Sequence, residues 1–138
     1  MKLRHGFMVI VLAVLPATVL AAGGIREGMW DITTRMEMPG MPMAMPPTTI
    51  RHCYTKEDVK DRKRMISRDK DCTVTDFRGT GNKVSWKMKC TGKHAGMFSG
   101  ETVFSGDSYD SVMHMQSEAG RGGSMTMKVK GKRVGNCP

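Results

Sequence analysis

The chain has 138 residues, with 22 Lys and Arg against 13 Asp and Glu, a formal net charge of +9 at pH 7, and 6% aromatic residues. This length favours one domain and excludes a multidomain architecture. The positive charge favours either contact with anionic lipid, lipopolysaccharide or cell wall, or a solvated basic face without a partner, and it does not bear on the fold.

The first 22 residues have the pattern of a cleaved signal peptide. A basic start is followed by the almost wholly apolar run Phe7–Leu20 and then by small residues. The run has about 14 residues, whereas a membrane-spanning helix needs roughly 20. We therefore expect cleavage after Ala21 or Ala22 and export, to the periplasm of a Gram-negative bacterium or to the medium. The remaining single domain, residues 23–138, keeps 20 basic residues against 13 acidic ones, a net charge of about +7.

Two strands are predicted on either side of a segment rich in methionine and proline. The run WDITTRMEM, Trp30 to Met38, alternates apolar and polar residues with period two, which predicts a half-buried strand. The segment MPGMPMAMPP that follows contains four prolines, so it is neither a helix nor an inner strand. The β-branched run TTIRHCY, Thr48 to Tyr54, predicts a short second strand.

A helix is predicted next. Thr55 followed three residues later by Asp58 is a capping-box pattern with Asp in place of Glu. Acidic residues come early in the following segment and basic residues come late, which suits the helix dipole. We predict one short, mostly exposed α-helix from Lys56 to about Ile66.

The four cysteines predict two disulfides. An even number of cysteines in an exported chain favours disulfides, and the absence of any close cysteine pair argues against a zinc site. The runs CTVTDFR and KVSWKMKC flank the turn sequence GTGN, and a three-residue loop between them places Cys72 opposite Cys90. We therefore predict Cys72–Cys90 and, by elimination, Cys53–Cys137. The same register places Asp76 opposite Trp86, as an unusual inward carboxylate.

A second hairpin and a last strand complete the predicted sheet. MFSGETVFS and SYDSVMHMQ flank a Gly-Asp turn suited to type II′, which places Phe104 opposite Tyr109. Residues 124–135 alternate again and can pair back on Ser108–Gln116. The fold class is therefore mainly β: a strongly curved antiparallel meander that closes as a small barrel or a sandwich, with one short α-helix.

Four stretches of the sequence resemble a known family. GMWDITTRMEMPGMPMAMPPTTIRHC, GNKVSWKMKC, FSGDSYDSVMHM and GKRVGNCP are similar to the bacterial exported domain-of-unknown-function family 3617, DUF3617, from Gly28 to Cys137. The resemblance implies an exported, β-rich domain. It implies no reaction, ligand or catalytic residue.

The methionines divide into two groups. Those on inward strand positions are interpreted as core filling, because methionine is flexible and fits irregular gaps: Met29, Met36, Met38, Met88, Met113, Met115, Met125 and Met127. Met41, Met43 and Met45 lie outside any strand, and an extended backbone would point their sulfurs to one side. Because Cu(I) accepts thioether ligands, these three residues, with His52 or His94 as a nitrogen donor, form a candidate copper site.

Two further functions stay open. A small barrel can hold an apolar or lipid-like ligand, with the methionine–proline segment as its lid. Lys128, Lys130, Lys132 and Arg133 would then contact an anionic head group or membrane surface. Alternatively, the protein is a structural or binding protein of the cell envelope that acts through contacts with an unknown envelope component, and the segment straps the sheet edge.

Catalysis and nucleic-acid binding have no support in the sequence. No nucleophile motif accompanies His52, His94 or His114, and His114 is predicted to face outward from its strand. AGRGGS lacks the lysine and the strand-to-helix setting of a phosphate-binding loop. No nucleic-acid-binding motif is present. We predict no enzymatic activity, no catalytic residue and no nucleic-acid partner.

Overall fold

The computed structural model describes residues 24–41, 43, 45–67, 69–117 and 123–138. The predicted signal peptide, residues 1–22, lies outside them. The described residues form seven strands, two short α-helices and one 3-10 helix: β1 (Gly28–Glu37), β2 (Thr48–Tyr54), α1 (Lys56–Lys60), α2 (Arg62–Ile66), β3 (Cys72–Thr80), β4 (Lys83–Cys90), η1 (Gly92–His94), β5 (Gly96–Phe104), β6 (Ser108–Ser117) and β7 (Met125–Gly135).

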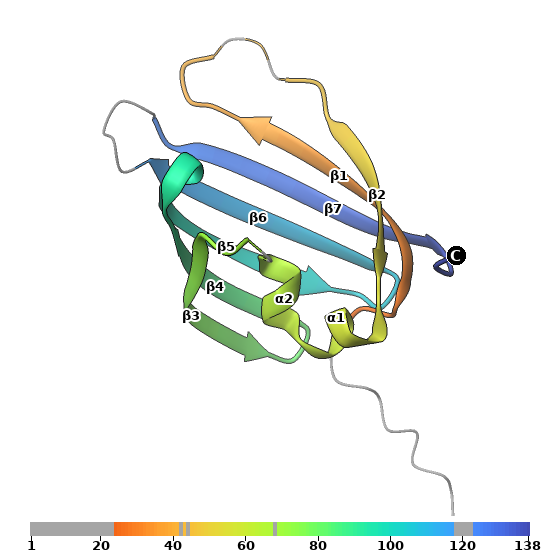
Figure 1. Cartoon of the computed structure of the whole chain (residues 1–138). Coiled ribbons are helices and arrows are strands. Elements are labelled where there is room, and N and C mark those ends of the chain that lie inside the picture. The colour runs from red at the N-terminus through yellow and green to blue at the C-terminus, as the bar shows by residue number, and fades with distance from the viewer. Residues whose placement is uncertain (1–23, 42, 44, 68, 118–122) are drawn as a thin grey trace, which may run out of the picture.

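All seven strands belong to one curled antiparallel sheet with the order β2-β1-β7-β6-β5-β4-β3 (Figure 1). The predicted meander is confirmed from β3 to β7. The sheet does not close, however, because β2 and β3 are its two edges and do not pair with each other. The predicted barrel is therefore not found. The chain between these edges forms α1 and α2, which lie in front of the sheet's concave face.

The predicted helix is two helices. The capping box is confirmed: the backbone N–H of Thr55 donates to Asp58 Oδ2 (2.9 Å), and the backbone N–H of Asp58 donates to Thr55 Oγ1 (3.3 Å). The helix breaks at Asp61, which has an extended backbone and accepts from the backbone N–H of Lys63 (3.0 Å). A short acidic side chain that binds the backbone two residues ahead competes with helical continuation.

The first hairpin follows the predicted register only in part. Cys72 and Cys90 are opposite each other, as predicted, but an irregularity between Val74 and Asp76 shifts the ladder by one residue. Phe77, and not Asp76, therefore faces Trp86. The prediction of an inward carboxylate at Asp76 is wrong, because one extra residue in a strand reverses which side chains face inward beyond it.

The second hairpin has the predicted register throughout. Phe104 pairs with Tyr109 and Gly100 pairs with Met113. Gly106 has a φ of +74°, the left-handed region that the first central position of a type II′ turn requires.

Two glycines on the concave face let aromatic rings lie flat on the sheet. A Cβ at Gly131 would lie 2.0 Å from Cε1 of Tyr109, the residue opposite it on β6. A Cβ at Gly100 would lie 2.7 Å from Cζ2 of Trp86 on β4. The large rings thus fill the core where glycine leaves space, and Trp30 is fully buried beside them.

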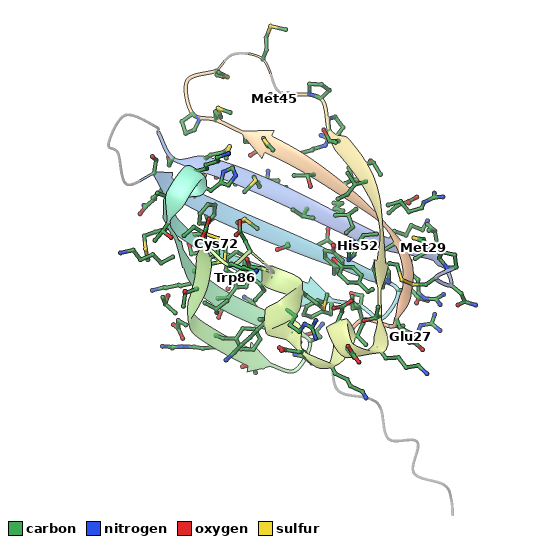
Figure 2. All side chains as sticks on the ribbon, viewed as in Figure 1. Glu27, Met29, Met45, His52, Cys72 and Trp86 are labelled. Atoms are coloured by element: carbon green, nitrogen blue, oxygen red, sulfur yellow. A yellow bond between two sulfur atoms is a disulfide. The ribbon has the colours of Figure 1, made fainter. Side chains whose placement is uncertain are left out.

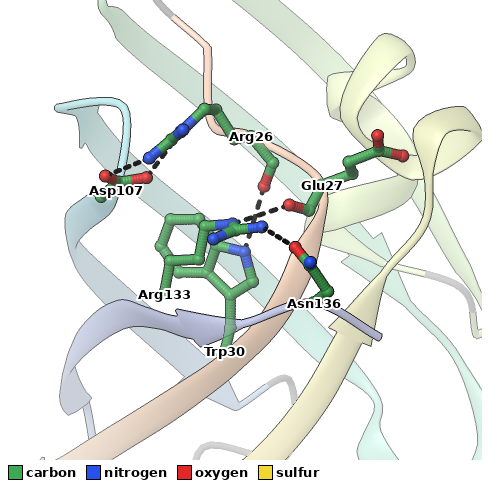
Figure 3. Close-up of polar contacts among 6 residues, drawn as sticks. All are labelled: Arg26, Glu27, Trp30, Asp107, Arg133 and Asn136. Carbon is green, nitrogen blue, oxygen red and sulfur yellow. Dashed lines mark hydrogen bonds and ion pairs between the residues drawn. The ribbon is translucent and has the colours of Figure 1, made fainter. Parts of the chain in front are cut away.

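The residues before β1 cover the Trp30 end of this core (Figure 3). Ile25 forms an isolated parallel bridge with Gly106, and the indole N–H of Trp30 donates to the carbonyl of Arg26 (3.1 Å). The Arg26 guanidinium binds both carboxylate oxygens of Asp107, with 2.7 Å between Nε and Oδ1. This hydrogen bonding holds the pKa of Asp107 below its usual value. The segment is thus tied to the β5–β6 turn.

Both predicted disulfides are present. Cys72–Cys90 crosses the first hairpin, and Cys53–Cys137 ties the C-terminus to β2. The second closes a loop with a sequence separation of 84 residues, which restricts the unfolded chain more strongly. Within the described part of the chain, no helix has both the length and the apolar character needed to cross a membrane.

Candidate functional site

A cavity of about 100 Å³ lies between α2 and the concave face, partly open to solvent. Met65 and Ile66 line it from α2, and Trp86, Phe104 and Met113 line it from the sheet. The last two residues of α2 face the sheet. Side chains alternate between the two faces of a strand, so every second residue of β4, β5 and β6 lies on the concave face. The cavity walls are therefore mainly apolar.

The polar groups at the cavity bind one another. Thr102 Oγ1 and Ser111 Oγ are 2.8 Å apart, and the Ser111 hydroxyl donates to the Glu101 carbonyl (3.1 Å). The hydroxyls of Tyr54 and Tyr109 are 3.3 Å apart. Burial, followed by the neighbouring Tyr54 hydroxyl, raises the pKa of Tyr109 well above its usual value. This phenol stays neutral at physiological pH, so the cavity floor carries no negative charge from it.

One cation lies at the cavity wall. The Arg62 guanidinium sits over the Phe104 ring, 5.7 Å from its centroid. Such a cation–π contact covers the ring with the flat guanidinium while the charged group stays near solvent. A polar head group at the cavity mouth would meet this cation.

Beyond the cavity, the concave face continues as two cross-strand rows of methionines. Met36, Met127 and Met113 are directly opposite one another on β1, β7 and β6. Met125 and Met115 form the next row on β7 and β6. Met36 is 37% exposed and the other four are half-buried. Apolar side chains thus line a strip of the concave face that begins at the cavity.

The structure does not gather the predicted loop site. Met41, Met43 and Met45 are 59%, 81% and 43% exposed. His52 lies on β2, where its ring meets the Tyr54 ring edge-on with 4.8 Å between centroids. Figure 2 shows Met45 in the loop at the top of the view and His52 lower on β2. Copper binding at the loop stays a prediction. The structure places His52 on β2 beside Tyr54 and does not bring it together with the three loop methionines.

Two of the four predicted anion-contacting residues already have acidic partners. Lys128 Nζ lies 2.8 Å from Glu37 Oε1, and Lys130 Nζ lies 3.6 Å from Asp110 Oδ1. Lys132 is exposed. All three lysines lie on the convex face, opposite the cavity, because they alternate with the inward Val129.

The fourth, Arg133, holds the C-terminal segment in place. It donates to the Glu27 carbonyl (2.8 Å) and to Asn136 Oδ1 (2.6 Å), as Figure 3 shows. Contact of the four basic residues with an anionic surface stays a prediction, and Lys128, Lys130 and Arg133 already interact with groups of the protein itself.

The remaining predicted donors are dispersed. His114 faces outward, as predicted, and its Nδ1 lies 3.1 Å from Thr126 Oγ1. His94 is exposed in η1. In the described ranges, no group of three or more His, Cys, Asp or Glu side chains is placed to hold a metal ion.

Sequence reasoning placed an apolar ligand inside a closed barrel and did not predict a cavity between α2 and an open sheet. The inward position of Met113, Met115, Met125 and Met127 was predicted correctly. Their partial exposure was not predictable from alternation, because it depends on where the helices stop covering the sheet. The available indication was composition: no leucine follows Leu20, so methionine occupies positions that leucine commonly fills.

Comparison with known proteins gives one result. The family model DUF3617, described as a protein of unknown function, matches residues 25–137. Neither the curated proteins nor the solved structures gave a match to this chain.

Proposed function

The chain belongs to the DUF3617 family of proteins of unknown function, and we propose from its geometry that it is an exported cell-envelope protein that binds an apolar, lipid-like chain on the concave face of its sheet. The cavity that opens onto the methionine rows is the observation that carries this proposal. Its four cysteines, all in disulfides, support an oxidising location such as the periplasm.

The size of the cavity determines how a ligand would bind. Sites that enclose a drug-sized ligand have roughly 300–1,000 Å³, and an engineered apolar cavity of about 150 Å³ binds benzene. At about 100 Å³, this cavity takes the end of an alkyl chain and no more. The rest of the alkyl chain would lie along Met36, Met127 and Met113, whose flexible side chains adapt to ligands of varied shape.

The polar end of the ligand is less constrained. Arg62 is the cation at the cavity wall, and besides its contact with Phe104 it has a further interaction within the protein. Its positive charge favours an anionic or strongly polar head group over a hydrocarbon without one. Fatty acids and lysophospholipids both combine such a head group with an alkyl chain. The convex-face lysines lie too far around the sheet to share this contact.

A cavity-filling substitution tests the proposal. Met65→Trp places an indole in the cavity, whereas Arg64→Trp places the same group on the exposed neighbouring position of α2. Binding of the fluorescent fatty acid cis-parinaric acid is measured by fluorescence, and folding is checked by circular dichroism. We expect Met65→Trp to weaken binding about tenfold or more, a loss of about 1.4 kcal/mol, and Arg64→Trp to leave it unchanged.

Equal affinities for the two variants would refute cavity binding. No binding to the wild-type protein would leave a structural envelope role as the better account. If Met65→Trp does not fold, the smaller change Ile66→Phe replaces it at the same cavity wall.

A further inference from the structure

Four methionines form a rectangular array on the concave face. Met113 is directly opposite Met127, and Met115 is directly opposite Met125, on the antiparallel strands β6 and β7. Opposed Cβ atoms lie about 4.5–5.5 Å apart, and residues two apart along a strand lie roughly 6.6–6.8 Å apart. Diagonal neighbours in such an array are within reach of long side chains. We call these four residues the methionine quartet.

The quartet is held by the sheet and is accessible to solvent. Both strands are internal, since β6 pairs with β5 and β7 pairs with β1. Each of the four side chains is half-buried. On β1, Met36 lies next to Met127 and is 37% exposed, so a fifth thioether borders the array. Backbone pairing thus places the four methionine side chains next to one another before any ligand binds, which lowers the entropic cost of binding.

The available donors select a soft ion. All four cysteines are in disulfides, and the described part of the chain offers no cluster of three His, Cys, Asp or Glu residues for a harder metal. Thioether sulfur is uncharged, has no proton to lose and prefers soft metals such as Cu(I). An ion bound by the quartet would therefore be soft, and neither Zn²⁺ nor Mg²⁺ would be favoured.

From this arrangement we propose that the methionine quartet binds one soft monovalent cation, Cu(I) or its analogue Ag(I). The proposal goes beyond apolar-ligand binding, because a soft cation needs the sulfur atoms, whereas an alkyl chain needs only apolar side chains. It also differs from the predicted loop site, since Met41 and Met43 lie in a segment without strand pairing and are 59% and 81% exposed.

Silver titration of the disulfide-intact protein tests the proposal. With methionine methyl groups labelled with carbon-13, Ag(I) binding is followed by NMR and its stoichiometry by native mass spectrometry. We expect one equivalent of Ag(I) to shift the methyl signals of Met113, Met115, Met125 and Met127. The signals of Met41 and Met43 should not shift at that ratio.

A fourfold Met→Leu substitution of the quartet removes the sulfurs and keeps apolar volume. Such volume-conserving swaps are usually tolerated in a protein core. We expect this variant to lose the one-equivalent silver complex while its circular dichroism spectrum stays that of the wild-type protein. The matched control, Met41→Leu with Met43→Leu and Met45→Leu, should retain the complex. If the fourfold variant does not fold, Met115→Leu with Met125→Leu removes half of the donors.

Three outcomes would overturn the proposal: no silver complex with the wild-type protein, an unchanged complex in the folded quartet variant, or loss of the complex in the loop variant. Fatty-acid binding is tested at Met65, which is not part of the methionine quartet. The failure of one proposal is therefore distinguishable from the failure of the other.

Discussion

The two ends of the concave face share strands β1 and β6 but are packed differently. At the aromatic end, Trp30, Tyr54, Phe104 and Tyr109 are all buried, with 5.6 Å between the ring centroids of Trp30 and Tyr109. At the methionine end, Met36 and the methionine quartet are only partly buried. From this difference we infer that the aromatic end contributes most of the stability of the core. The methionine end can therefore keep flexible side chains accessible to a ligand.

Truncation at each end tests this division most strongly. Trp30→Ala removes a fully buried indole and should lower the free energy of unfolding by about 3–5 kcal/mol. Met127→Ala removes a half-buried side chain and should cost about 1 kcal/mol. Urea unfolding of both variants gives the two values. Similar losses would show that the two ends contribute equally to stability.

A smaller change probes the ring that lies on Gly131. Gly131→Ala introduces a Cβ 2.0 Å from Cε1 of Tyr109 and should destabilise the protein by about 1–3 kcal/mol through overpacking. Gly135→Ala, on the same strand, meets nothing within 4 Å and serves as the control. Thermal unfolding should separate the two variants clearly, and equal melting temperatures would contradict the ring packing described here.

The smallest expected effect concerns alkaline pH. Because folding raises the pKa of Tyr109, its contribution to stability is complete below the unfolded pKa of about 10 and declines as the pH rises above it. The decline is at most about 1.4 kcal/mol per pH unit. Urea unfolding between pH 8 and 11 should show a steeper fall for the wild-type protein than for Tyr109→Phe. If the stability of both proteins falls equally with pH, burial does not raise the pKa of the Tyr109 phenol.

Local features of the chain predicted most of the sheet. The Gly106 turn set the register that pairs Phe104 with Tyr109, and the opposed positions of Cys72 and Cys90 predicted their disulfide. The capping box at Thr55 was also correct. Each of these depends on residues that are close in sequence, where turn geometry and side-chain alternation act directly.

The errors have equally specific causes. The irregularity between Val74 and Asp76 reverses the alternation without a sequence marker such as glycine or proline. The break at Asp61 depends on its side chain binding the backbone N–H of Lys63, in competition with the helix. In both places two local structures compete, and alternation or helix propensity alone does not decide between them.

By itself, the sequence determined the strands, the inward positions of Met113, Met115, Met125 and Met127 and the turn at Gly106, because these depend on short-range periodicity and turn chemistry. Only the tertiary structure decided that β1 lies between β2 and β7, that the sheet stays open and that α1 and α2 cover one part of its concave face. Pairing between strands far apart in the chain is selected by the packing of the whole core. That packing also determines which methionines are left accessible for a ligand.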